Sequence, residues 1–140
     1  MNKTDKTKNI LGVLLAADAL LLFLCVKVFA PVCTGTVETV AGKQMPMKCH
    51  YTSAVLIFLS ILLLANAVVS LVTKQGKACG IMAIVISVFV FVVFSDTMGI
   101  GICMKPEMAC HVTAPFAKLL AVVQIIIGAI MTVVSFKKAE

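Results

Sequence analysis

Four long apolar segments, separated by short polar ones, make up most of the chain. They run from about Ile10 to Val32, Thr52 to Val72, Cys79 to Met98 and Thr113 to Phe136. A helix needs about 20 apolar residues to cross the hydrocarbon of a bilayer, and each segment reaches that length. Because lipid cannot hydrogen-bond to the backbone, segments that cross it must be helical. The pattern predicts an all-α membrane protein, a single domain of four transmembrane helices over residues 1–140.

The composition agrees with a membrane protein. Of the residues, 61% are hydrophobic and 13% are charged, and the mean hydropathy is +1.13, whereas about a quarter of the residues in soluble domains are charged. The basic residues are all lysines and do not cluster with aromatic residues, so nucleic acid is not an expected partner. No glycine-rich phosphate loop, paired carboxylates or serine–histidine–acid set is present, and the short loops leave little room for an enzyme.

The distribution of lysines predicts the orientation in the plasma membrane. Most lie at the two termini and in the short turn between the second and third apolar segments: Lys3, Lys6, Lys8, Lys74, Lys77, Lys137 and Lys138. Since basic residues are enriched in cytoplasmic loops, both termini are expected in the cytoplasm and the other two loops outside it. The first segment is expected to be retained and not cleaved as a signal peptide, because it is long and Pro31 would follow the cleavage point.

A six-residue motif occurs twice, each time directly before an apolar segment. The chain has MKCHYT at residues 47–52 and MACHVT at residues 108–113, and a further cysteine precedes each motif, Cys33 and Cys103. This spacing predicts a tandem repeat of two helical hairpins in the same orientation. Parallel repeats of this kind are related by an axis along the membrane normal, which would bring the two motifs face to face at the outer surface.

The motifs carry candidate ligands. Thr52 and Thr113 are of a residue type that caps helix N-termini, which would place His50 and His111 just outside the helices. Two imidazoles suit haem iron, and imidazole with thioether sulfur suits copper, Cu(I) in particular. Covalent c-type haem attachment is excluded because C-x-x-C-H is absent. The predicted ligands of haem b or a copper-like metal are His50, His111, Met45, Met47, Met104 and Met108.

The six cysteines divide into two groups. Cys25 and Cys79 lie in or near the apolar segments, while the other four lie in the loops expected outside. An even number of cysteines on an oxidising side favours disulfides, and the simplest pairing is Cys33 with Cys49 and Cys103 with Cys110. Free thiols that act as metal ligands or as the redox groups of a thiol–disulfide protein are the alternative.

Several polar residues interrupt the apolar segments. An intramembrane carboxylate is costly unless it is paired or faces protein, so we expect Asp18 to be neutral and hydrogen-bonded, with a proton relay as the alternative. Near the outer face, Lys27 is expected to pair with Asp96 or to extend to the interface. Asn66 is expected at a depth similar to that of Asp18. Groups that hold helices together are expected at Ser87, Gln124, Gly128 and Ala129.

The stretch MPMKCHYT at residues 45–52 resembles an uncharacterised family of small bacterial four-span membrane proteins, catalogued as a domain of unknown function. The family's motif is Met-x-Met-Lys-Cys-His-aromatic-Thr, with a second Cys-His motif before the fourth span. Its genes often lie beside those of ABC exporters, so the resemblance implies an accessory role. The leading hypothesis is an outward-facing haem or metal site in a protein accessory to such an exporter. The alternatives are a partner subunit with disulfide-stapled loops and no small ligand, and a thiol–disulfide redox protein.

Overall fold

The computed structural model describes residues 3–29, 36–38, 40–46, 48–73, 75–95, 97–101, 107 and 110–137. The first helix, α1 (Lys3–Leu24), continues as a π-helical turn, η1 (Cys25–Phe29). A short hairpin of β1 (Thr36–Glu38) and β2 (Gln44–Pro46) follows, in antiparallel register with Val37 opposite Met45. The remaining helices are α2 (Lys48–Thr73), α3 (Gly76–Val93) and α4 (Cys110–Lys137).

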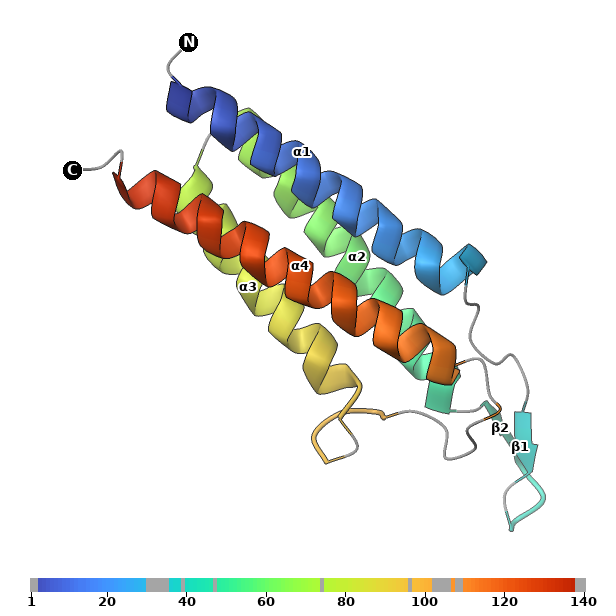
Figure 1. Ribbon diagram of the computed structural model, residues 1–140. Coiled ribbons are helices and arrows are strands. Elements are labelled where there is room, and N and C mark those ends of the chain that lie inside the picture. Colours follow the sequence, from blue (N-terminus) through green and yellow to red (C-terminus); the bar gives the residue numbers. More distant parts are fainter. Residues whose placement is uncertain are drawn as a thin grey trace.

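The four helices form an antiparallel bundle (Figure 1). The most extensive packing is between α3 and α4 and between α1 and α2, while α2 with α3 and α1 with α4 complete the ring. Helices α2 and α4 therefore occupy diagonal corners. Both termini lie at one end, with the turn before α3; we call this the terminal end. We call the opposite end, where α2 and α4 begin and the hairpin lies, the motif end (Figure 1).

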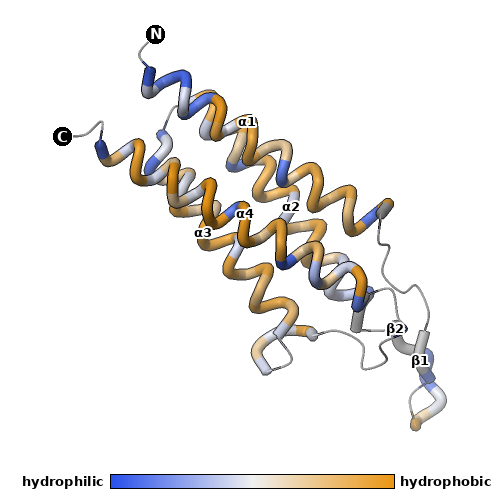
Figure 2. Tube along the Cα trace, viewed as in Figure 1, coloured by the Kyte–Doolittle hydropathy of each residue, from blue (hydrophilic) through white to orange (hydrophobic). Residues whose placement is uncertain are grey.

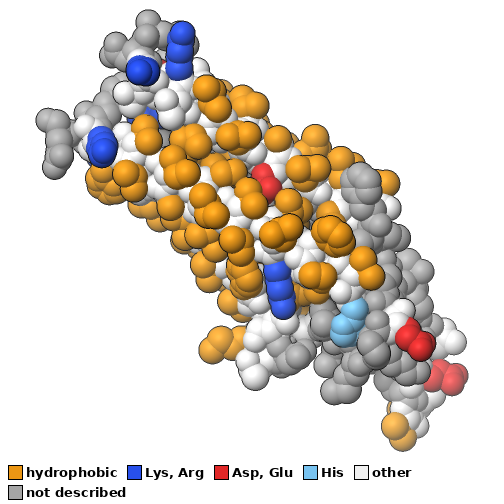
Figure 3. Space-filling view, viewed as in Figure 1, with side chains coloured by type: hydrophobic (Ala, Val, Ile, Leu, Met, Phe, Trp, Pro, Cys, Tyr) orange, Lys and Arg blue, Asp and Glu red, His pale blue; other side chains and the backbone are white. Residues whose placement is uncertain are grey.

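All four helices are long and apolar enough to cross a membrane. Their inward faces bury side chains such as Leu15, Leu22, Leu56 and Leu63, which have no exposed surface. Their outward faces are apolar as well, as the hydropathy of the tube and the broad hydrophobic surface show (Figures 2 and 3). A helix that is apolar on all sides is typical of a membrane span. The all-α membrane class predicted from the sequence is thereby confirmed.

Helices α3 and α4 approach closely at two glycines. A Cβ on Gly80 would lie 2.8 Å from the carbonyl oxygen of Gly128, and a Cβ on Gly128 would lie 2.9 Å from the carbonyl oxygen of Gly80. Small residues permit such backbone contact between membrane helices. Gly128 thus has the role expected of it. The same expectation for Ala129 was wrong, because Ala129 is exposed.

The element boundaries differ from the predicted ones at the motif end. Helix α3 ends at Val93 and not near Met98, because the chain turns back: the Gly101 N–H donates to the Val93 carbonyl at 3.1 Å. Helices α2 and α4 begin before the motif threonines, at Lys48 and Cys110. The capping role predicted for Thr52 and Thr113 was therefore wrong, since both lie inside a helix. The short hairpin was not predicted either.

Candidate functional site

The two histidines lie at the same end of the bundle. His50 is in the first turn of α2 and His111 is in the first turn of α4, and Figure 3 shows histidine surface at the motif end. His50 is exposed, and its ring meets the Tyr51 ring edge-on at a centroid distance of 6.0 Å. His111 is half-buried. The structure therefore brings both motifs to one end, and it gives the two imidazoles different exposure.

The motif threonines occupy matching buried positions. Thr52 is 3% exposed and Thr113 is 1% exposed. A helix turns about 100° per residue, so a residue two positions earlier lies on nearly the opposite side. This explains why His50 is exposed although Thr52 is buried.

Thr52 makes a tertiary hydrogen bond in place of the predicted cap. Its Oγ1 donates to the carbonyl oxygen of Gly101 at 3.0 Å, in a buried position. Gly101 has a φ of 73°, which a residue with a side chain rarely adopts. The bond ties the first turn of α2 to the segment that follows α3, so the start of the first motif helix is held by the second half of the chain.

Much of the predicted ligand and disulfide set lies outside the described residues. This applies to Met47, Met104 and Met108, to Cys33 and Cys103, and to the side chains of Met45, Cys49 and Cys110, whose backbones lie in β2, α2 and α4. Among the described residues, no three His, Cys, Asp or Glu side chains are grouped to hold a metal ion. Cys25 and Cys79 are free and buried, as the sequence predicted for these two.

Three polar side chains, one each from α1, α3 and α4, lie together inside the bundle. Asp18 of α1 is 5% exposed, and Ser87 of α3 and Gln124 of α4 have no exposed surface. Ser87 Oγ lies 2.7 Å from the carbonyl oxygen of Ala83 and 3.1 Å from Gln124 Oε1. The Gln124 side chain is the polar neighbour of the Asp18 carboxyl, yet Asp18 Oδ2 and Gln124 Nε2 each lack a hydrogen bond of normal geometry among the described residues.

Ser87 has two acceptors within hydrogen-bond distance of its hydroxyl. A serine hydroxyl has one hydrogen to donate, and if Ser87 gives it to Ala83, it has none for Gln124 Oε1. The Gln124 side chain presents its Oε1 to Ser87 and lies beside the Asp18 carboxyl. That Asp18 is neutral and hydrogen-bonded, as expected from the sequence, stays a prediction.

The other intramembrane polar residues have separate surroundings. Asn66 Nδ2 donates to the carbonyl oxygen of Cys79 at 2.9 Å. Lys27 is exposed, and its predicted partner Asp96 lies outside the described residues. Sequence reasoning overlooked Lys118, an exposed residue within α4 whose Nζ lies 5.8 Å from the centroid of the Phe94 ring. A long side chain of this kind carries its charge toward the membrane surface along an apolar stem.

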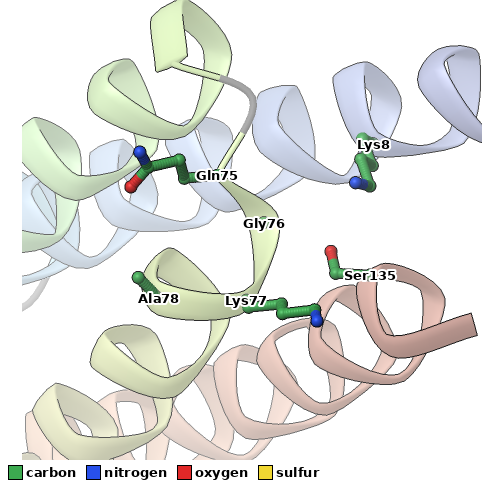
Figure 4. Close-up of a pocket in the computed structure, with 6 residues that line it drawn as sticks. All are labelled: Lys8, Gln75, Gly76, Lys77, Ala78 and Ser135. Atoms are coloured by element: carbon green, nitrogen blue, oxygen red, sulfur yellow. The ribbon is translucent and has the colours of Figure 1, made fainter. Parts of the chain in front are cut away.

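A cavity of about 340 Å³ lies at the terminal end. Its lining comes from α1, from the start of α3 and from α4: Lys8, Gln75, Gly76, Lys77, Ala78 and Ser135 (Figure 4). The sequence indicated these lysines only as markers of orientation. Ser135 carried no signal at all.

Residues 10–135 match a family model described as Domain of unknown function (DUF4418). The chain belongs to this family. The DUF4418 match includes all of α2 and α3, both Cys-His motifs and all but the ends of α1 and α4. No curated protein and no solved structure matches the chain. Membership of the DUF4418 family does not indicate a function, so any function has to be inferred from the residues of the chain.

Proposed function

We propose that this DUF4418 protein binds haem or a soft metal ion such as Cu(I) at the motif end of its transmembrane bundle, on the outer side of the plasma membrane. The observation that carries the proposal is the placement of His50 and His111 in the first turns of α2 and α4, at one end of the molecule. Helices α2 and α4 occupy diagonal corners of the bundle, so a shared ligand would bridge the motif end between them.

The donor set favours these ligands over harder metal ions. Imidazole nitrogen, thioether sulfur and thiolate sulfur together suit Cu(I), while a pair of imidazoles suits haem iron. Carboxylates, which Mg²⁺ and Ca²⁺ prefer, are few in the sequence near the motif end: Glu38, Asp96 and Glu107. His111 is half-buried, and the exposed ring of His50 needs no repacking of the core to reach a ligand.

The test is a titration of the detergent-purified protein with hemin and, separately, with Cu(I) against a competing chelator. We expect either hemin or Cu(I) to bind, and His50→Ala and His111→Ala each to weaken that binding by more than about tenfold. A loss of about tenfold is the smallest that is typical when even a group outside the ligand shell of a metal site is removed. Gln44→Ala, an exposed change at the same end, is the matched control. Equal binding by all four proteins would contradict the proposal.

The hairpin supports a second candidate, a subunit that docks on the extracytoplasmic part of an ABC transporter permease. Residues 40–44, at and beside its turn, are all exposed, and Val40 is fully so. The hairpin extends beyond the helix ends (Figure 1). Since an isolated two-stranded hairpin is only marginally stable in water, contact with a partner would account for an apolar residue at its tip.

This role is tested by copurification. An affinity-tagged protein should retain an ABC transporter permease from its native membrane, and Val40→Asp should reduce the amount retained, while His50→Ala and His111→Ala should not. Thr73→Asp, an exposed change at the other end of the bundle, is the control. Retention that survives Val40→Asp and removal of the hairpin would contradict docking through this element.

A further inference from the structure

The cavity at the terminal end combines groups from three helices. Lys8 belongs to α1, Gln75 to Ala78 belong to the start of α3, and Ser135 belongs to α4. In Figure 4 the side chains of Lys8 and Lys77 extend toward Ser135, whereas the side chain of Gln75 extends away from it. Two cationic groups and a hydroxyl thus surround one space.

The Ser135 hydroxyl is an unsatisfied polar group in the lining of this cavity. Ser135 is 4% exposed, and its Oγ has no hydrogen-bond partner among the described residues. Buried hydroxyls normally have a partner because an unsatisfied one costs free energy. A ligand oxygen in the cavity would supply that partner.

Gly76 allows the Ser135 hydroxyl to lie directly against the start of α3. A Cβ at this position would collide with Ser135 Oγ and would lie 3.7 Å from the Cε atom of Lys8. The missing side chain therefore points to the place where Ser135 and Lys8 converge. Because Gly76 is the first residue of α3, a ligand in this place also meets the start of a helix.

The electrostatics of the cavity favour an anion. The first N–H groups of a helix have no partner within the helix, and the helix dipole is positive there. The residue that precedes α3, Gln75, makes no side-chain capping hydrogen bond. Lys77 Nζ is held 4.7 Å from the centroid of the Phe136 ring, which keeps its charge beside the cavity. A phosphate group suits such a combination of helix N-terminus, ammonium and hydroxyl donors.

We propose that this cavity binds the phosphate oxyanion of an anionic lipid headgroup. It lies between helices at one end of the apolar surface, where headgroups meet a transmembrane bundle. The described residues at this end include five lysines and a single acidic residue: Lys3, Lys6, Lys8, Lys77, Lys137 and Asp5. Basic pockets between transmembrane helices on the cytoplasmic side are known to receive lipid headgroups.

Native mass spectrometry of the full chain, released from vesicles of phosphatidylglycerol and phosphatidylcholine, tests this. We expect selective retention of phosphatidylglycerol. Lys8→Gln and Lys77→Gln should each weaken retention by about fivefold, and Ser135→Ala by about tenfold. Lys118→Gln, which removes a lysine outside the cavity, should leave retention unchanged.

Ser135→Ala separates ligand binding from folding. The Ser135 hydroxyl has no partner among the described residues, so its removal should leave the melting temperature in phosphatidylcholine unchanged. Retention of phosphatidylglycerol that is unchanged in Ser135→Ala and in the Lys8→Gln/Lys77→Gln double variant would overturn the proposal. Displacement of the lipid by an equal concentration of inorganic phosphate would overturn the lipid assignment in favour of a soluble oxyanion.

Discussion

Ser87 Oγ of α3 lies 3.1 Å from Gln124 Oε1 of α4, and both side chains are fully buried. With Asp18 beside Gln124, three helices contribute polar groups at one place in an apolar core. In such a place each donor needs an acceptor, because no solvent replaces a missing partner. A charged carboxyl in such a place is costly unless it is paired, so we predict that Asp18 is neutral.

The first prediction concerns that acid. At neutral pH, Asp18 should contribute the infrared C=O band of a carboxylic acid, and the band should disappear in Asp18→Asn. Gln124→Leu should move the band to higher frequency because it removes the polar neighbour of the carboxyl. Ser60→Ala is the control, since Ser60 is buried and bonds only locally, to the carbonyl oxygen of Ile57 at 2.7 Å. Loss of a carboxylate band in Asp18→Asn would show that Asp18 is charged.

The second prediction concerns the contact between α3 and α4. Gly80→Ala should destabilise the bundle by about 2 kcal/mol, because overpacking forces a backbone shift where a Cβ would lie 2.8 Å from the Gly128 carbonyl oxygen. Unfolding in mixed detergent measures this. Ala129→Leu, next to the contact but exposed, should change the stability by less than about 0.5 kcal/mol. Equal effects of the two substitutions would contradict the close approach.

The number and type of the helices could be predicted from the sequence, because the transfer of each apolar segment into lipid depends on its own residues. The helix ends depend on contacts that the local sequence does not show. Helix α3 ends at Val93 because the chain turns back and the Gly101 N–H donates to the Val93 carbonyl. Thr52 donates to the Gly101 carbonyl in that same turn and does not cap a helix. The hairpin lies in a polar stretch with no alternating pattern. Its clearest indication in the sequence is Gly42, because the turn has a φ of 74° at that position, which glycine readily adopts.

The two candidate sites also differ in how well the sequence predicts them. His50 and His111 could be found because their motif is repeated and each copy precedes an apolar segment. Ser135 and Lys8 could not, since they come from opposite ends of the chain and meet only through the packing of α1, α3 and α4. A lone serine near the end of an apolar helix gives no indication of a partner so far away in sequence.

The third prediction concerns the thiols. Without reduction, the denatured protein should react with an alkylating reagent only at Cys25 and Cys79, the free buried pair. After reduction all six cysteines should react, because the other four are predicted to form two disulfides. Tryptic mass mapping identifies the modified positions, and a Cys25→Ser/Cys79→Ser variant should not react before reduction. Alkylation of Cys49 or Cys110 in the unreduced protein would favour the ligand or redox alternative.

The fourth prediction concerns orientation. Because lysine is concentrated at the terminal end, this end should be cytoplasmic. Green fluorescent protein fused after the last residue should fluoresce, and alkaline phosphatase at the same place should be inactive. An epitope inserted at Val40, which is fully exposed, should be detected on intact spheroplasts. The reverse pattern would place the motifs inside the cell and would exclude the oxidising surroundings assumed for the cysteines.

The most direct test of the proposed function is the cofactor content of the protein as isolated. Protein purified from its native membrane in mild detergent is analysed by absorption spectroscopy and elemental analysis, beside the His50→Ala/His111→Ala double variant. We expect either a Soret band with stoichiometric iron or stoichiometric copper without that band, and the loss of whichever signal is present in the double variant. Protein that folds, carries both histidines and shows neither signal would contradict a haem or metal site at the motif end.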